Sequence, residues 1–561
     1  TLTPTTDAAL SEIDSDANLV LVTTAGSIES LSTGGGAITA SGNMLLKAGG
    51  ASSNITLGAV VTNTTAGGDT SLNAGQDILQ NANIVANTSA MTIDLVAGRN
   101  ITMADGTSTT STNGNILLQA GTDVTIETLA AGTGNVSVTA TGQDILDQDA
   151  AGDTGVDITA AGLLLKAGRG IGAGNNHLET TVTTLTAAAA SGGIFVTESD
   201  GITVDTLTIN VDRVDATSTA TTTSNAAQSN LVTSSGGHIV LVSTTGDLVL
   251  SDDVTAAGAG NVLLKATAGG VTQNNAIDGG SGSISIVAGT SIAEKAGITT
   301  TGTGTIDLQA GTSIAMDNGT TTSGAANIRY VATTTLTVGS ITTTGDVSLS
   351  ASSITDSGTT DTDVTADELR IVTTGTASGN GAGTGSKALE ISVAKLAADV
   401  NGTGTGGLFL TEANDILVGT LNAINVNQVG TDGSTLTATT DVALSEIDSD
   451  ANLVLVTTAG SIESLSTGGG AITASGNMLL KAGGSTSNLK LGAVVTNTTA
   501  GGNTSLNAGQ DILQNANIVA NTSGKSIDMV AGRNLTMANG TSTTSNDGNI
   551  LLQAGTDITI E

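Results

Sequence analysis

Four residues of the chain have side chains of the kind that cleave polysaccharides. Asp252 and Asp253 stand together in a Ser-Asp-Asp stretch, and His238 follows two glycines. Arg329 lies in the stretch Asn-Ile-Arg-Tyr. Enzymes that cleave glycosidic bonds need carboxyl groups, with or without a basic residue, that converge on one groove. These residues define one hypothesis, a polysaccharide-cleaving or polysaccharide-binding protein.

The internal copies of the sequence argue against an enzyme. His238 aligns with Asn18 and Asn452 of the other copies, so the histidine is not a fixed part of the repeat. A solvated turn accounts for the polar residues near it. His177, the other histidine, lies in a segment that breaks the repeat, and we expect it to be exposed. We therefore predict no enzyme, no catalytic residue and no cofactor-binding residue.

Acidic residues also suggest a metal site. Glu12, Asp14 and Asp16 lie close together in the sequence, and Asp448 and Asp450 occupy the same positions in the later copy. Carboxylate oxygens at this spacing suit calcium. A 12-residue calcium loop ending in glutamate is absent, as is a glycine- and aspartate-rich nonapeptide array. We predict no metal residue, and calcium binding remains an alternative.

The composition excludes several classes of partner. The 561 residues carry a net charge of −35 with only 15 Lys and Arg, which argues against binding to nucleic acid. Cysteine is absent, so neither disulfides nor Cys-ligated zinc can form. No run of about 18 apolar residues is present to span a membrane. The chain begins without Met or a signal-like segment, which we interpret as a fragment or a processed product.

Repeats occur at three lengths. Residues 1–127 recur at 435–561 with 16 differences, and a weaker, shorter repeat, in which 92–111 matches 305–323, lies beneath this. The weaker repeat predicts a partial preceding unit at 1–17 and repeat units at 18–237, 238–451 and 452–561, the last incomplete. The shortest period is marked by Ala-Gly pairs, whose glycines stand at positions 49, 75, 98 and 121. A short and nearly constant period of this kind is typical of a solenoid.

The shortest repeat predicts two strands joined by a corner. In residues 116–126 apolar side chains alternate, the alternation breaks at Gly121, and it then resumes. Alternation with period two indicates a strand. We expect the motif glycine to supply a positive φ at the corner, and the polar residue near it, such as Asn100 or Asp123, to bond its own backbone.

These patterns predict an all-β protein, a right-handed parallel β-helix (β-solenoid) with turns of about 22–26 residues. Ile, Leu and Val should fill the interior, and Thr and Asn should stack outside. The chain has one Tyr, two Phe and no Trp, which suits a thin interior. Longer insertions are expected near 171–230 and 371–437, as lateral loops or a small side subdomain, with an inserted β-sandwich as a less favoured alternative.

Stretches such as AGRNITM, AGQDILQ, AGTDVTI and GNVSVTATG resemble the repeats of filamentous-haemagglutinin-type adhesins, which are large bacterial surface proteins. The resemblance implies a right-handed β-helical shaft, export to the cell surface, and a role in adhesion or matrix building. The secretion domain of that family is not recognisable here.

We therefore predict a structural, extracellular fibre or stalk at the cell surface, belonging to a giant repetitive protein that supports adhesion, sheath or matrix formation. Its expected partners are copies of itself, end to end or as a continuing array, and cell-surface glycans. Neither nucleic acid nor a membrane span is expected. The polysaccharide-binding or polysaccharide-cleaving β-helix is the alternative.

Overall fold

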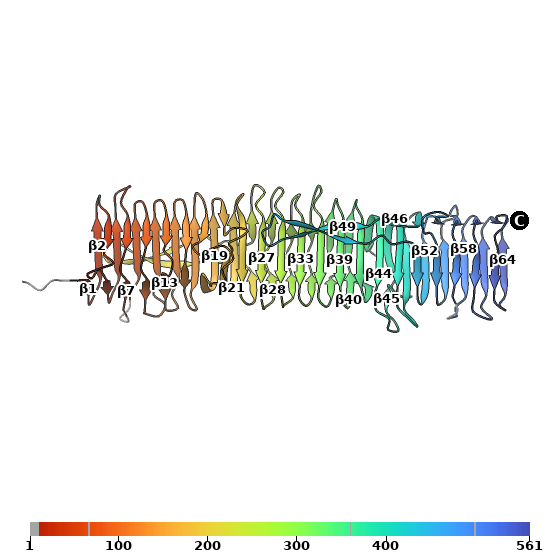
Figure 1. Cartoon of the computed structure of the whole chain (residues 1–561), viewed down its shortest axis with the longest axis horizontal. Coiled ribbons are helices and arrows are strands. Elements are labelled where there is room, and N and C mark those ends of the chain that lie inside the picture. Colours follow the sequence, from red (N-terminus) through yellow and green to blue (C-terminus); the bar gives the residue numbers. More distant parts are fainter. Residues whose placement is uncertain (1–10, 65–67, 359–360, 499–500) are drawn as a thin grey trace, which may run out of the picture. The chain divides into compact units, whose positions relative to one another are not determined.

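The computed structural model describes residues 11–64, 68–358, 361–498 and 501–561, and these residues form strands, turns and loops without a helix. Accordingly, they include no helix long and apolar enough to cross a membrane. The chain divides into two compact units. The first unit comprises Thr1–Gly269 and Gly430–Thr435, and the second comprises Gly270–Val429 and Leu436–Glu561. Both are stacks of parallel strands, and the described residues form a β-solenoid of about 24 turns, which confirms the predicted fold class (Figure 1).

A single turn has three sides. In the first unit these are β8 (Thr70–Ala74), β9 (Ile78–Gln80) and β10 (Ile84–Ala86). The chain then returns beside β8 as β11 (Ile93–Ala97), β12 (Ile101–Met103) and β13 (Ser108–Ser111), and the next turn begins with β14 (Ile116–Ala120). Ile93 pairs in parallel with Thr70 of the preceding turn and with Ile116 of the following turn. Each turn therefore satisfies its backbone groups on its two neighbours.

Turn length varies slightly more than predicted. Ile328 of β39 (Ile328–Ala332) pairs with Val347, which makes a turn shorter than the predicted range. Val136 of β17 (Asn135–Ala140) pairs with Leu163, which makes a turn longer than that range. The added or missing residues lie in the turns between strands, because the paired strands keep their register.

The interior is built from the predicted alternating positions. In residues 116–126 the inward side chains are at most 1 % exposed; they are Ile116, Leu118, Ala120, Val124 and Ile126. Equivalent positions stack on one another, since Ile116 pairs with Ile93 below and Val136 above. Columns of aliphatic side chains result, and burial of their apolar surface is the main force that favours this fold.

The motif glycines do not have the positive φ that was expected. Gly75, Gly98 and Gly121 are absent from the glycines with positive φ. A Cβ on Gly121 would instead lie 2.2 Å from the carbonyl oxygen of Gly98, one turn below. Close approach between successive corners, rather than backbone conformation, therefore requires glycine at these positions.

The polar residues near the corner also act differently from the prediction. The Asn100 backbone N–H donates to Asp77 Oδ1 at 3.2 Å, and the Asp123 N–H donates to Asn100 Oδ1 at 3.2 Å. Each side chain thus accepts from the next turn rather than from its own bend. These bonds form a ladder parallel to the stack and link turn to turn outside the strands.

The segments 171–230 and 371–437 are only partly insertions. Their first halves are solenoid turns with long strands, β21 (Leu178–Ala189) and β46 (Leu389–Val400). These pair in parallel with β19 (Ile158–Ala167) and β44 (Val364–Thr373). The prediction overestimated the insertions because the alternation in these long strands is diluted by Thr and Ala.

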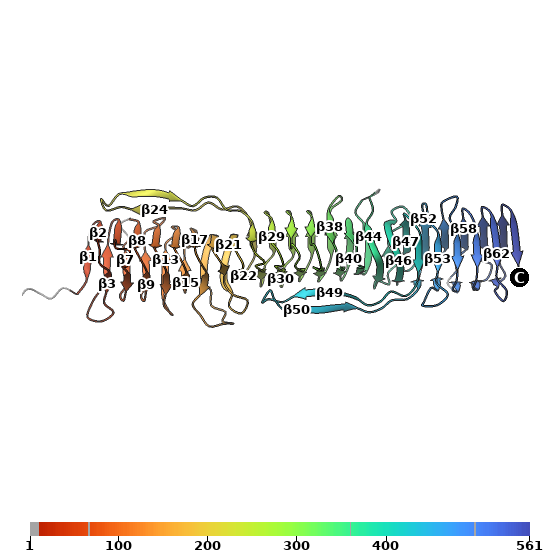
Figure 2. The ribbon, with the colours of Figure 1, turned by 90° about the horizontal axis from the view of Figure 1, so that it is seen from above.

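The second halves leave the solenoid as two antiparallel hairpins. In the first, β24 (Asn210–Val214) pairs with β25 (Ala220–Ser224). The second pairs β49 (Ile424–Val429) with β50 (Leu436–Asp441). Figure 2 shows β24–β25 running lengthwise over turns of the first unit and β49–β50 over turns of the second. Neither hairpin is a β-sandwich, so that alternative is wrong for the described residues.

The long strands also move the repeat to a new side of the solenoid. In the first unit Ile145 of β18 (Ile145–Asp147), the second strand of its turn, pairs with Ile171. Ile171 pairs with Ile194, and Ile194 pairs with Ile239 in β27 (Ile239–Ser243), which begins the next copy of the motif. The motif strand therefore changes from one side to the adjacent side within the unit.

Candidate functional site

The basic residue of the enzymatic hypothesis holds a hairpin in place. Arg329 Nη1 lies 3.1 Å from Asp307 Oδ1, and Arg329 Nε lies 3.1 Å from Asp441 Oδ2 at the end of β50. Its side chain is only 12 % exposed. The guanidinium is thus mostly buried and paired with two carboxylates of the second unit.

His238 takes the place of asparagine in the ladder between turns. Its Nδ1 accepts the backbone N–H of Asn261 at 2.9 Å. In the same way Asn18 Oδ1 accepts the Asn43 N–H at 2.8 Å. Burial lowers the pKa of His238, which keeps Nδ1 free to accept, although Asp432 opposes this shift. The alignment of His238 with Asn18 therefore has a structural explanation.

The remaining catalytic candidates do not converge. Asp252 Oδ2 accepts the Thr206 hydroxyl at 2.9 Å, and Asp253 is exposed. His177 is half-buried, contrary to the prediction, because its ring lies 5.8 Å from that of Phe195 and its Nδ1 is 2.8 Å from Thr197 Oγ1. Asp252 and His177 thus make ordinary contacts within the fold and do not line a shared groove.

The acidic residues of the alternative calcium hypothesis are not brought together. Glu12, Asp14 and Asp16 are exposed, as are Asp448 and Asp450. Carboxylates do gather elsewhere in the described residues, in three groups whose oxygens lie within 4.8 Å of one another. The first unit holds Asp105, Glu127 and Asp149, and also Asp147, Asp157 and Glu179; the second unit holds Asp356, Asp363 and Glu390.

The groups Asp147/Asp157/Glu179 and Asp356/Asp363/Glu390 have the same construction. The Glu179 N–H donates to Asp157 Oδ2 at 2.8 Å, and the Glu390 N–H donates to Asp363 Oδ2 at 2.8 Å. In both groups one aspartate ends a strand, a second precedes a long strand, and the glutamate lies in the next long strand. We call these two groups the carboxylate triads.

Burial raises the proton affinity of both triads. Desolvation raises the pKa of Asp157 to about 9 and that of Glu179 to about 7, and neighbouring carboxylates add to both shifts. Desolvation also raises the pKa of Asp363 to about 8. Protons or a hard cation can offset this repulsion, and carboxylate oxygens are the ligands that calcium prefers.

The two triads differ in their nearest neighbour. Lys387 Nζ lies 3.6 Å from Asp356 Oδ2 in the second unit. Asn176 has the corresponding place in the first unit, and its Nδ2 donates to Asp147 Oδ2 at 2.7 Å. The first triad therefore lacks the ammonium group that partly neutralises the second. Sequence reasoning missed both triads because their members are scattered along the sequence, and only their recurrence one period later could have revealed them.

Comparison of the chain with known protein families, with curated proteins and with solved structures found no match. The resemblance to filamentous-haemagglutinin-type adhesins therefore stays a prediction, while the β-solenoid rests on the structure itself.

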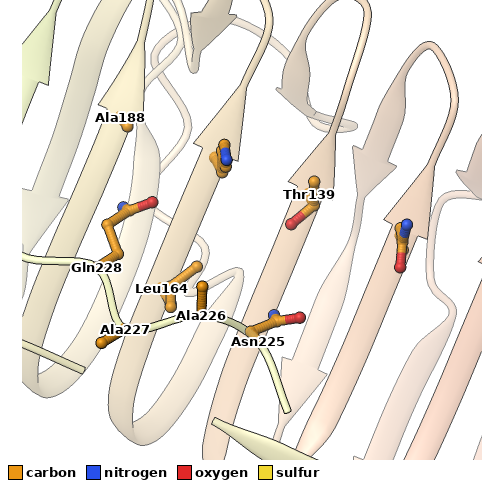
Figure 3. Close-up of a pocket in the computed structure, with 9 residues that line it drawn as sticks. Thr139, Leu164, Ala188, Asn225, Ala226, Ala227 and Gln228 are labelled. Atoms are coloured by element: carbon orange, nitrogen blue, oxygen red, sulfur yellow. The ribbon is translucent and has the colours of Figure 1, made fainter. Parts of the chain in front are cut away.

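A cavity lies under the return limb of the first hairpin. It has a volume of about 400 Å³, is partly open to solvent, and lies between residues 225–228 and the outward side chains of four solenoid strands. Figure 3 shows Asn225 and Gln228 of the limb facing Thr139 and Leu164. Gln228 Nε2 donates to the Leu165 carbonyl at 3.0 Å, so the limb is attached to the wall of the cavity.

Proposed function

We propose that the chain is a non-enzymatic structural element, the fibre or stalk of a large extracellular repetitive protein that supports adhesion, sheath or matrix formation. The observation that carries this proposal is the register of equivalent residues from turn to turn inside each unit. Ile93, for example, lies between Thr70 and Ile116, and Leu95 lies between Leu72 and Leu118. With such stacking, the length of the solenoid increases with the number of residues in the chain, and a stalk requires length.

The contacts made by the candidate catalytic residues support the same proposal. Arg329 holds a hairpin, and His238 bonds the next turn. We infer that the polar residues of the repeat were retained for contacts between turns. Copies of the chain, joined end to end or as a continuing array, are the proposed partners, together with glycans of a cell surface.

Electron microscopy of chains that carry one, two and three copies of the long repeat (residues 1–434) tests this function. We expect the particle length to rise by about 4.8 Å for each added turn at constant width. A length that does not increase with the number of copies would contradict the fibre. Antibody labelling of intact producing cells tests the surface location, and labelling only after cell lysis would argue against it.

Polysaccharide binding is a second candidate, favoured by the cavity in Figure 3. Gln119, Lys166 and Gln228 line it, and amide and ammonium groups can bond sugar hydroxyls. A glycan array probed with the wild-type chain and with Gln119→Ala would separate the candidates. Binding that is lost in this variant favours the cavity, and absence of binding leaves the purely structural role.

A further inference from the structure

The two carboxylate triads contain buried oxygen atoms that accept no hydrogen bond. In the second triad the Asp356 side chain is only 1 % exposed, yet its Oδ2 has no hydrogen-bond partner, and Glu390 Oε2 also has none. In the first triad Glu179 Oε2 is shielded from solvent without a partner, as is Oδ1 of the neighbouring Asn176. Burying a polar oxygen without a donor costs free energy, so these atoms favour a bound ligand that is positively charged.

Lys387 does not satisfy the oxygens of the second triad. Its Nζ donates to the main-chain carbonyl of Asp356 at 2.6 Å and lies 3.6 Å from Oδ2 of the same residue. A single ammonium group therefore faces three carboxyl groups. In the first unit the uncharged amide of Asn176 has this place, and it donates to Asp147 Oδ2 at 2.7 Å and to the Asp149 carbonyl at 3.1 Å. Both triads thus have an excess of acidic groups, and the excess is greater in the first.

The oxygens of each triad are close enough to share one ion. One carboxylate oxygen from each member lies within 4.8 Å of those from the other two. Calcium binds oxygen at about 2.3–2.6 Å, so two ligands on opposite sides of the ion can be about 5 Å apart. Three carboxylates, each bound through one or two oxygens, supply about three to six of the six to eight oxygens that calcium takes, and water can supply the rest. A donor set of oxygen alone suits calcium rather than zinc or copper.

Surface pockets give both triads a path for an incoming ion. In the first unit Asp153 and Glu179 line a pocket of about 380 Å³ that is partly open to solvent. In the second unit Asp361 and Asp363 line a similar pocket of about 450 Å³. Each pocket therefore carries one more aspartate beside a member of the triad, and this added negative charge raises the local concentration of cations.

The triads lie where the solenoid changes to long strands. In the first unit Asp147 ends β18, Asp157 directly precedes β19, and Glu179 lies in β21. The second triad has the corresponding positions at β43 (Ser353–Asp356), β44 and β46. Strands β19 and β21 are paired neighbours in successive turns, so an ion bound to all three carboxylates would link those turns.

We propose that each carboxylate triad binds one calcium ion, which joins successive turns where the long strands begin. The third acidic group, Asp105, Glu127 and Asp149, is not included. Asp105 is exposed, and the described residues of the second unit hold no equivalent of this group. The triads, in contrast, recur in both units with the same construction and with buried oxygens that lack a partner.

The two sites should differ in affinity because of one residue. The Lys387 ammonium group repels a cation at the second triad, whereas Asn176 leaves the first triad without this repulsion. Lys387→Asn should therefore tighten calcium binding at the second site, and Asn176→Lys should weaken it at the first, each by about tenfold. A gain of affinity in Lys387→Asn cannot result from misfolding.

Isothermal titration calorimetry of the full chain, first dialysed against a chelator and then titrated with calcium chloride, tests the proposal. Sodium chloride at about 0.15 M screens diffuse attraction between calcium and the acidic surface. We expect saturable binding of two ions per chain. Glu179→Gln and Glu390→Gln should each remove one ion while preserving the size of the side chain. Asp317→Asn changes an exposed aspartate outside the triads and should leave both ions bound.

Two results would overturn the calcium sites. One is the absence of saturable binding to the wild-type chain, and the other is binding of two ions by a chain that carries both Glu179→Gln and Glu390→Gln. Circular dichroism of each variant checks that the strands are retained. These measurements report ion binding alone, so the fibre role can stand or fail independently of them.

Discussion

The carbonyl oxygen of Gly75 lies 2.2 Å from the point where a Cβ on Gly98 would be. Gly98 in turn places its own carbonyl 2.2 Å from the Cβ position of Gly121. Non-bonded carbon and oxygen atoms do not approach this closely, so a side chain at any of these corners must push two turns apart. Glycine at Gly75, Gly98 and Gly121 therefore allows the close spacing of successive turns at this corner.

Gly98→Ala should lower the stability of the first unit by about 1–3 kcal/mol, the usual cost of overpacking. The atom in the way is backbone, which cannot rotate aside. Thermal unfolding followed by circular dichroism measures the effect. Gly26→Ala is the matched control, because no atom lies within 4 Å of its Cβ position and its φ is not positive. Equal melting temperatures for the two variants would refute the close-approach explanation.

Ala90 and Gly524 offer a comparison between the two copies. Ala90 has φ of 67°, and its counterpart Gly524 has φ of 76°. An alanine in this region is strained, whereas glycine is not. Ala90→Gly should therefore stabilise its turn and Gly524→Ala should destabilise its own, each by about 1 kcal/mol. Hydrogen exchange at residues 88–92 and 522–526 resolves the local effects, and shifts of the same sign in both variants would contradict the prediction.

Tyr330 should contribute to stability through a buried polar contact. Its hydroxyl lies 2.9 Å from Glu294 Oε2 and 2.8 Å from Thr322 Oγ1, and both Tyr330 and Glu294 are fully buried. Tyr330→Phe leaves the Glu294 oxygen without this donor and should cost about 1–3 kcal/mol. Tyr330→Phe combined with Glu294→Leu and Thr322→Val should recover part of the loss, because all three hydrogen-bonded side chains are then apolar. Denaturant unfolding measures both variants, and a combined variant no more stable than Tyr330→Phe would contradict the prediction.

The architecture was predictable because one local pattern repeats. Alternation at residues such as Ile116 and Leu118 indicates strands, and the even spacing of Gly75, Gly98 and Gly121 indicates successive turns of similar length. Together, the alternation and the regular glycine spacing favour a β-solenoid over other all-β folds. Longer strands such as β21 were misjudged because Thr and Ala side chains weaken the contrast between the two faces.

The contacts between distant residues were not predictable from one sequence. Arg213 and Asp94 are 119 residues apart, and nothing near either residue specifies the other. The same holds for the triads, since Asp147 and Glu179 meet only after the chain has completed a turn. The role of the corner glycines was misjudged for a related reason. A prediction from local backbone conformation does not include the carbonyl oxygen of the preceding turn, which is the atom that excludes a side chain.

The stability of the chain should depend on pH through the buried carboxyl group of Asp157. Its pKa is raised from 3.8 to about 9 by burial first, and by Asp147, Glu179 and Asp153. The folded chain therefore keeps a proton that the unfolded chain releases above about pH 4. The free energy of unfolding should fall as pH rises from about 4 to 9, by at most about 1.4 kcal/mol per pH unit for this proton. Below this window the contribution is constant.

Asp157→Asn removes the titration while keeping an oxygen that can accept the Glu179 N–H. The variant should lose less stability than wild type between pH 5 and 9, measured by urea unfolding without divalent ions. Asp252→Asn, which lies outside the triads, should behave like wild type. Millimolar calcium should stabilise the wild-type chain most at high pH, where it replaces the missing protons, and should have a smaller effect on Asp157→Asn. Identical pH profiles for wild type and Asp157→Asn would show that the buried carboxyl group does not retain its proton.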